Sequence, residues 1–221
     1  MRRITVGNFE FDVEIERKNI KYCYVKVEGR KIKVKAPVGV SENKIIKKVL
    51  EKIRRLKLDE VEKSLLNDFL FFGKPYKIIK GKSFSVNHRK RIIFLNQKCR
   101  DRLVRYLEVS LERYAENYVK KIYKKFGLNF IPEIKVDSIG SDKLGCVKNG
   151  KVYLNFCLSF FPKYLIRYII THELLHFKIS SHNSIFRHLI SLIYPNYRKI
   201  EKEVKKFLII TQYNKNLNQF K

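Results

Sequence analysis

The sequence THELLHFKISSH, from Thr171 to His182, holds three of the five histidines of the chain together with a glutamate. His172 and His176 are four residues apart, so on an α-helix their imidazoles lie on one face, close enough to bind one metal ion. Glu173 projects about 100° around the helix from His172. That direction suits a carboxylate that holds a metal-bound water, so the pattern predicts a metal site with Glu173 as general base.

Spacing alone leaves two alternatives for the third metal ligand. A catalytic zinc takes three protein ligands and keeps its fourth position for water. His182 is the first candidate, because residues 177–181 are enough to end the helix and turn the chain back. A carboxylate farther along, Glu201 or Glu203, is the alternative. Bound zinc lowers the pKa of water and polarises a carbonyl or phosphoryl oxygen, so the expected reaction is hydrolysis.

The H-E-x-x-H pattern can also occur by chance, with its histidines as ordinary buried residues. Here, however, the pattern continues the apolar stripe of a helix that Pro162 is suited to begin. That stripe is Leu165, Ile169, His172 and His176. The longer metzincin pattern is not met, because Ile179 stands at its glycine position and the only methionine is Met1.

Length and composition indicate a globular protein. The chain has 221 residues, 45% of them apolar and 32% charged, which is enough for one or two small domains. No apolar run approaches about eighteen residues, and the first residues lack the apolar core of a signal peptide. We therefore expect a soluble, cytoplasmic protein without a membrane partner. The four cysteines show no C-x-x-C spacing, so they predict neither a zinc knuckle nor a disulfide framework.

The net charge of +28 arises from 49 basic and 21 acidic residues. Such a field attracts nucleic acid or another polyanion, which makes nucleic acid a possible partner. Abundant lysine is also typical of proteins from hot environments, although there it is usually matched by glutamate. Composition is compatible with both origins of the charge, and it does not indicate the oligomeric state.

Patterns of period two predict a sheet in the first part of the chain. We expect a β-meander from strands at 9–16, 22–27 and 32–36, and then a helix at 41–58, capped by Ser41. The inner face of this helix is predicted to carry Ile45, Val49, Ile53 and Leu56. Two more strands are predicted at 76–79 and 91–95. Residues 1–98 are therefore predicted to form an N-terminal β-rich module with a helix.

From residue 100 the apolar period becomes helical and predicts a long helix that Gly127 ends. Its buried stripe is predicted to consist of Leu103, Leu107, Leu111, Tyr114, Tyr118 and Ile122. Strands at 134–136 and 151–155 then precede the H-E-x-x-H helix, and helices at 184–193 and 198–210 follow it. His88 is predicted to be solvated in a basic loop. The sequence thus predicts an α+β protein whose second domain, 99–221, carries the metal site.

Several stretches of the chain match motifs of one known protein family in the same order. Residues 17–37 resemble its basic R-K-x-I…A-P segment, 150–155 its G-x-I-x-L-N motif and 170–176 its V-x-H-E-L-x-H motif. Phe186 follows the third histidine by four residues, and residues 194–198 resemble its L-P-D-W-R motif. Nearly the whole chain therefore resembles the YgjP-like metallopeptidase family, which is related to the SprT/Spartan and WLM zinc peptidases.

The resemblance implies a zincin-like α/β metallopeptidase domain whose active-site helix carries H-E-x-x-H. It implies Zn²⁺ on His172, His176 and His182, with Glu173 as the base that helps a metal-bound water to hydrolyse peptide bonds in a protein or peptide substrate. One motif departs from the family, because its R-W-G-S-C loop is Asp142–Cys146 here, without the tryptophan and with the first charge reversed.

Two other functions stay open at this point. The first is a metal-dependent nucleotide pyrophosphatase of the UTP type, an activity also attributed within this family. The second is a nucleic-acid-associated binding protein whose zinc is structural, which a full four-ligand shell would favour. Three tyrosines are candidate oxyanion donors, although packing is the simpler role for each: Tyr153, Tyr194 and Tyr197.

Overall fold

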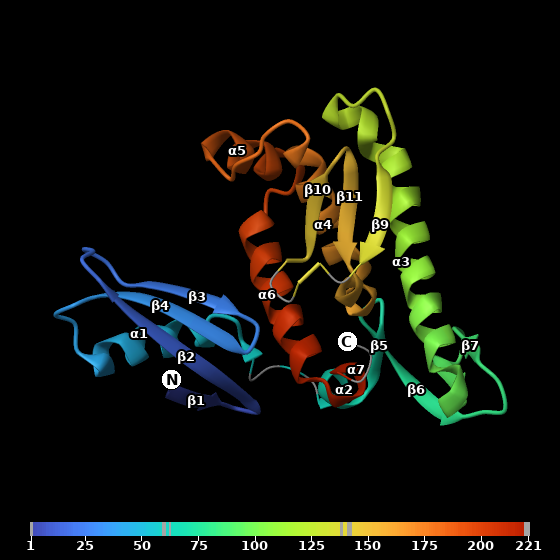
Figure 1. Ribbon diagram of the computed structural model, residues 1–221, viewed down its shortest axis with the longest axis horizontal. Helices are drawn as coiled ribbons and strands as arrows, with labels where there is room; N and C mark the ends of the chain where they lie inside the picture. Colours follow the sequence, from blue (N-terminus) through green and yellow to red (C-terminus); the bar gives the residue numbers. More distant parts are fainter. Residues whose placement is uncertain (1, 59–60, 62, 138, 141–142, 219–221) are drawn as a thin grey trace. The chain divides into compact units, whose positions relative to one another are not determined.

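The computed structural model describes residues 2–58, 61, 63–137, 139–140 and 143–218. These residues form a mixed α+β fold with three small sheets (Figure 1). The chain divides into two compact units, one made of Met1–Asn67 with Glu201–Asn218 and the other containing Asp68–Ile200. Every predicted strand and helix is present, with small shifts at the ends. The sequence missed four short strands, at Arg2–Val6, Phe69–Phe71, Ser85–Asn87 and Gly145–Lys148, and two short helices, at Lys63–Asn67 and Lys215–Asn218.

The first unit contains a sheet in the order β1-β2-β4-β3. Its strands are β1 (Arg2–Val6), β2 (Phe9–Lys18), β3 (Tyr24–Glu28) and β4 (Lys31–Pro37). β2 and β4 are parallel neighbours, so the predicted β-meander is wrong. β4 takes the central position because its alternate residues Ile32, Val34 and Ala36 are fully buried, whereas β3 is at most half-buried and forms an edge.

Helices from both ends of the chain complete the core of this unit. The predicted inner residues of α1 (Glu42–Arg54) are buried, whereas Ser41 occupies the N-cap position without a side-chain capping bond. The chain returns through α6 (Tyr197–Tyr213) and ends in α7 (Lys215–Asn218), near α2 (Lys63–Asn67). Ile209 of α6 belongs to the same hydrophobic core, and the Tyr213 ring lies edge-on to Phe9 at 5.0 Å.

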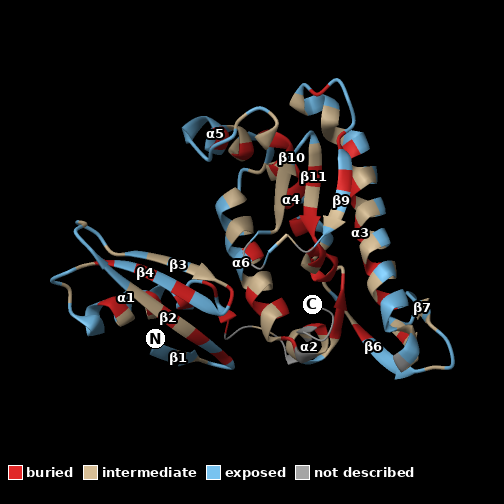
Figure 2. Cartoon of the chain, in the orientation of Figure 1, coloured by how far each residue is buried: buried red, intermediate tan, exposed pale blue. Residues whose placement is uncertain are grey.

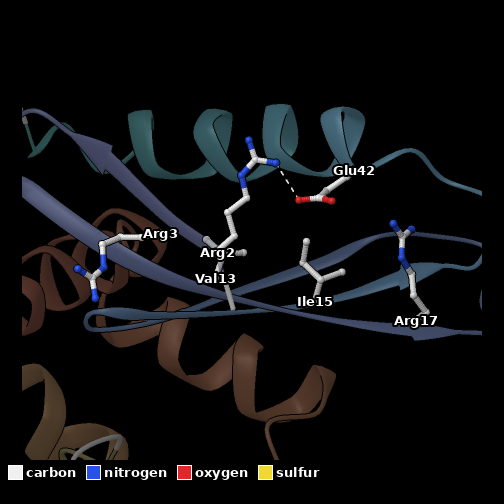
Figure 3. A pocket seen from close by; sticks show the side chains of 6 residues that line it. All are labelled: Arg2, Arg3, Val13, Ile15, Arg17 and Glu42. Atoms are coloured by element: carbon white, nitrogen blue, oxygen red, sulfur yellow. Dashed lines mark hydrogen bonds and ion pairs between the residues drawn. The ribbon is translucent and has the colours of Figure 1, made fainter.

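A hollow of about 650 Å³ lies in the first unit, and Figure 3 shows the side chains that line it. Its three arginines already have partners. Arg2 forms an ion pair with Glu42 of α1 at 2.8 Å, Arg3 lies 3.3 Å from Asp12, and Arg17 donates to the Pro37 carbonyl. Half-exposed ion pairs of this kind contribute little to stability. The cationic groups here are therefore engaged within the protein.

The second unit contains two sheets and the helices that pack on them. One sheet has the order β5-β6-β8-β7 and the other β10-β11-β9. The strands are β5 (Phe69–Phe71), β6 (Lys74–Lys80), β7 (Ser85–Asn87), β8 (Ile92–Leu95), β9 (Glu133–Asp137), β10 (Gly145–Lys148) and β11 (Lys151–Asn155). The helices are α3 (Arg100–Ile122), α4 (Lys163–His176) and α5 (Ser184–Ile193). α4 packs against β10 and β11, and α3 packs against β9. No helix in the described ranges is long and apolar enough to cross a membrane.

Residues after Asn67 join the second unit because the turn that follows β5 is hydrogen-bonded to the segment that precedes α4. The backbone N–H of Phe72 donates to the Ser159 carbonyl at 2.8 Å, and that of Gly73 donates to the Phe160 carbonyl at 3.0 Å. Gly73 has φ +74°, and a Cβ there would lie 2.6 Å from Pro162. The compact units thus divide the chain after Asn67. The predicted division into domains 1–98 and 99–221 stays a prediction.

The buried stripe of α3 differs from the predicted one beyond Leu111. The fully buried residues are Leu103, Leu107, Leu111, Ala115 and Val119, at regular four-residue steps, as the red positions along α3 in Figure 2 show. Tyr114 and Tyr118 are only half-buried and lie on the flank of this stripe. The predicted stripe included these two tyrosines and omitted Ala115 and Val119, although a small residue such as Ala115 is what a close contact between elements accommodates.

Replacing Ile209 with Ala should destabilise the first unit by about 2–4 kcal/mol, because it leaves a cavity in a core made mostly of residues 9–58. Urea unfolding followed by circular dichroism measures this loss. Lys205→Ala, at an exposed position of the same helix, is the matched control and should change stability by less than about 0.5 kcal/mol. A fragment 1–98 as stable as the whole chain would contradict the role given to α6.

Candidate metal centre

The helix α4 places two of the predicted ligands as expected. Pro162 is its N-cap and His176 its last residue, so His172 and His176 occupy successive turns. The chain then turns through residues 177–182, and Asn183 begins α5 by accepting a hydrogen bond from the Phe186 N–H at 2.9 Å. His182 therefore lies directly before a capped helix, which brings its ring back over α4.

The three imidazoles converge on one point. The Nε2 atom of His182 lies 2.7 Å from that of His172 and 3.2 Å from that of His176. One ligand atom from each of the three residues falls within 4.8 Å of the others, and this cluster contains neither Glu201 nor Glu203. Zinc bound tetrahedrally at 2.0–2.1 Å would separate its nitrogen ligands by about 3.3 Å. The donor set fits a divalent metal such as zinc.

Phe186 of α5 holds the three rings together. Its ring centroid lies 4.8 Å from His172, 4.9 Å from His176 and 4.8 Å from His182, and its side chain is buried. Nδ1 of His176 lies 2.9 Å from the Ile179 carbonyl. A carbonyl can only accept, so Nδ1 carries the proton and Nε2 keeps its lone pair for a metal.

Burial controls the charges at the centre. It lowers the pKa of His172 to about 3, and the neighbouring His176 and His182 add to the shift. His172 is therefore a neutral imidazole, the form that binds metals. Burial also raises the pKa of Glu173 to about 7, because it removes the water that would stabilise the ionised carboxylate.

A hollow of about 450 Å³ opens beside the histidines. Its other lining residues are Glu173, Ser180 and a wall formed by Lys143, Gly145, Cys146 and Val147. Gly145 of β10 presses on Glu173, since a Cβ at this position would lie 2.8 Å from both Cγ and Oε1 of the carboxylate side chain. A bare backbone at residue 145 therefore fixes where Glu173 lies. This contact was not predicted from the sequence, because it joins two separate segments through tertiary packing.

The three candidate oxyanion donors lie elsewhere. Tyr153, Tyr194 and Tyr197 do not line the hollow beside the histidines. The Tyr194 hydroxyl instead lies 3.2 Å from that of Tyr118 and 3.4 Å from Oγ1 of Thr171, and burial raises its pKa. This hydroxyl cluster supports α4 one residue before His172. The altered family motif begins at Asp142, which lies outside the described residues.

A family model described as "YgjP-like, metallopeptidase domain" matches residues 21–207. No curated protein and no solved structure matches the chain. The matched range includes Asp68–Ile200 of the second unit, part of the first unit and all of the residues that form the candidate metal centre, and its description is that of a hydrolase. The chain, whose H-E-x-x-H helix first suggested a metal-dependent hydrolase, belongs to the YgjP-like metallopeptidase family.

Proposed function

We propose that this protein is a zinc-dependent peptidase with a zincin-like catalytic domain. The observation that carries the proposal is the convergence of His172, His176 and His182 beside a buried Glu173 at an open hollow. Zinc held there would supply Lewis acidity toward a water and toward the carbonyl of the scissile bond.

The residues of the protein bind the metal, orient its ligands and transfer the proton. The three imidazoles bind the metal, and Phe186 and the Ile179 carbonyl orient them. Glu173 takes a proton from the attacking water and passes it to the nitrogen of the leaving amine. Gly145 keeps the Glu173 carboxylate in place. Within the described residues the cluster has three members, which favours an open coordination position over a closed structural site.

The wall of the hollow favours a peptide as the substrate. β10 lies at the edge of its sheet and, in the part of the chain that the structure describes, pairs only with β11. An extended peptide can add to such an edge through main-chain hydrogen bonds. A nucleoside triphosphate would instead need several cations for its phosphates. Besides the histidines, Lys143 is the one basic residue among those that line the hollow.

The proposal is tested by incubating the zinc-loaded protein with an unfolded protein and, separately, with nucleoside triphosphates. Cleaved polypeptide is measured on gels and by mass spectrometry, and released pyrophosphate is measured by a coupled assay. We expect peptide products that disappear with a chelator and return with zinc. Pyrophosphate release without peptide cleavage would overturn the proposal in favour of a nucleotide hydrolase.

Glu173→Gln should lower peptide cleavage by at least about 10²-fold, because an amide keeps the shape of the side chain but cannot accept the proton. Zinc content, measured by mass spectrometry of the metal, should stay at the wild-type level. A variant that lost both zinc and activity would show that Glu173 is a ligand instead of the base.

His182→Ala should weaken zinc binding by at least about 10²-fold, because it removes one of three nitrogen ligands from the shell. Glu201→Gln is the matched control for the alternative ligand set and should bind zinc as the wild type does. X-ray absorption should lose a nitrogen neighbour only in His182→Ala, and the reverse pattern would assign the third ligand to Glu201.

Gly145→Ala should reduce cleavage by about 10²-fold while leaving zinc bound, because the new methyl group displaces the Glu173 carboxylate and spares the imidazoles. Gly39→Ala adds the same methyl group where nothing lies within 4 Å and should be as active as the wild type. Full activity of Gly145→Ala would mean that the position of Glu173 is not set by β10.

A further inference from the structure

A long groove runs along α3 in the second unit, apart from the hollow beside the histidines. It consists of two hollows, of about 790 Å³ and 460 Å³, that share Tyr114 and Asn117. The larger lies among β5, β6, the turn between β7 and β8, α3 and the start of α4 (Figure 1), and the smaller continues along α3 toward its C-terminal end. Neither shares a lining residue with the metal hollow. We call it the α3 groove.

The α3 groove is lined by cations without acids. Its basic residues are Lys74, Arg91, Arg113, Lys121, Lys125, Lys163 and Arg167, and among the described residues no Asp or Glu lines it. None of the seven forms an ion pair with a carboxylate in the described ranges, whereas Glu28 pairs with two lysines and Glu133 with another two. The positive charge of this groove is therefore available to an external anion.

The sequence of α3 sorts its side chains onto two flanks of the buried stripe. The buried residues Leu107, Leu111 and Ala115 are each preceded by a groove residue and followed by a glutamate. The preceding residues are Tyr106, Ser110 and Tyr114, and the following ones are Glu108, Glu112 and Glu116. At 100° per residue the two sets lie about 200° apart, so the acids of α3 are kept away from the groove.

Aromatic side chains line the same groove, and hydrogen bonds and ring contacts hold them in place. His88 lies 2.9 Å from the Tyr76 hydroxyl and 2.7 Å from the Tyr106 hydroxyl, and it stacks on Phe71. Sequence reasoning predicted a merely solvated His88, but its ring is exposed and fixed at the same time. A fixed, partly exposed array of rings is suited to stack on other planar groups.

Two of the cations lie over aromatic rings instead of beside carboxylates. Lys163 Nζ is 5.0 Å from the Phe72 ring and 5.1 Å from the Tyr114 ring, and Arg167 Nε donates to the Tyr114 hydroxyl at 2.8 Å. The Arg167 guanidinium also lies 5.9 Å from the Tyr118 ring. Each contact holds a positive charge in the groove without neutralising it.

We propose that the α3 groove binds single-stranded nucleic acid. Unpaired bases would stack on the aromatic side chains while successive phosphates meet the cations, the combination that single strands require. The span from Tyr106 to Tyr118 is about 18 Å at 1.5 Å per residue, which exceeds one nucleotide. A duplex hides the faces of its bases, so it would gain only the charge contacts. This activity goes beyond the proposed peptidase and does not depend on it.

The test measures fluorescence anisotropy of the full-length protein with a labelled single-stranded 12-mer, in DNA and RNA forms. A duplex of the same sequence and a free nucleoside triphosphate serve as competitors, each over a series of salt concentrations. We expect the single strand to bind at least tenfold more tightly than the duplex, with log affinity falling by about 0.7 per phosphate contacted for each unit of log salt. A duplex that binds equally well, or a free nucleotide that competes as well as the 12-mer, would overturn the proposal.

Charge reversal locates the site. Arg113→Glu with Lys163→Glu should weaken single-strand binding at least tenfold and make the salt slope shallower by about 1.4, the share of two phosphates. Lys44→Glu with Lys48→Glu, at exposed positions of α1, changes the net charge equally and should have a much smaller effect. Equal losses in the two variants would show that affinity follows net charge alone and would overturn the proposal.

Substitutions at Tyr114 separate stacking from folding. Tyr114→Phe keeps a ring and should bind as the wild type does, whereas Tyr114→Leu should bind about tenfold more weakly because stacking is lost. Thermal unfolding and zinc content should be the same in both. Unchanged binding in Tyr114→Leu would rule out base stacking in the groove.

Discussion

Three imidazole rings with Nε2 atoms 2.7 and 3.2 Å apart would repel one another if they were protonated, so the second unit must keep them neutral and oriented. It meets this requirement by burial and by packing. α4 is enclosed on nearly every side, which removes the water that would stabilise a charged ring. Phe186 then contacts all three rings, so one aromatic side chain from a separate helix fixes the geometry that a metal needs.

The same helix connects two chemically different surfaces. Lys163 and Arg167, near the start of α4, line the α3 groove, and His172 and His176, near its end, line the metal hollow. Between them, Thr171 lies within 3.4 Å of the hydroxyls of Tyr118 and Tyr194. Since a buried helix moves as a rigid element, these contacts give both surfaces a common support. The glutamates of α3 face away from the α3 groove, so the groove keeps the positive charge that a polyanion would need.

The sequence predicted interactions between residues that are close together in the chain, and it missed those between distant segments. His172 and His176 are one helical turn apart, so their pairing follows from local geometry, and His182 needs only a short loop to join them. The contact between Gly145 and Glu173 joins two segments through tertiary packing, and no local pattern encodes it. The strand order failed for the same reason. Alternation identified β4 as a strand, but only its greater burial placed it between β2 and β3. In α3, the predicted stripe included Tyr114 and missed Ala115, because close packing, which favours a small residue, depends on the element that the helix meets.

The first unit is built from two segments that lie on either side of the second unit in the sequence. This arrangement sets the order in which the two units can fold during synthesis. Its core lacks Ile209 until the ribosome has made all of Asp68–Ile200, which at 5–20 residues per second takes about 7–27 s. The metal-binding unit is therefore synthesised in full before the core of the first unit can be completed. A nascent or prematurely terminated chain would carry a finished second unit joined to an N-terminal sheet whose core still lacks Ile209 and Tyr213, a form in which chaperones and quality-control proteases would recognise the N-terminal segment first.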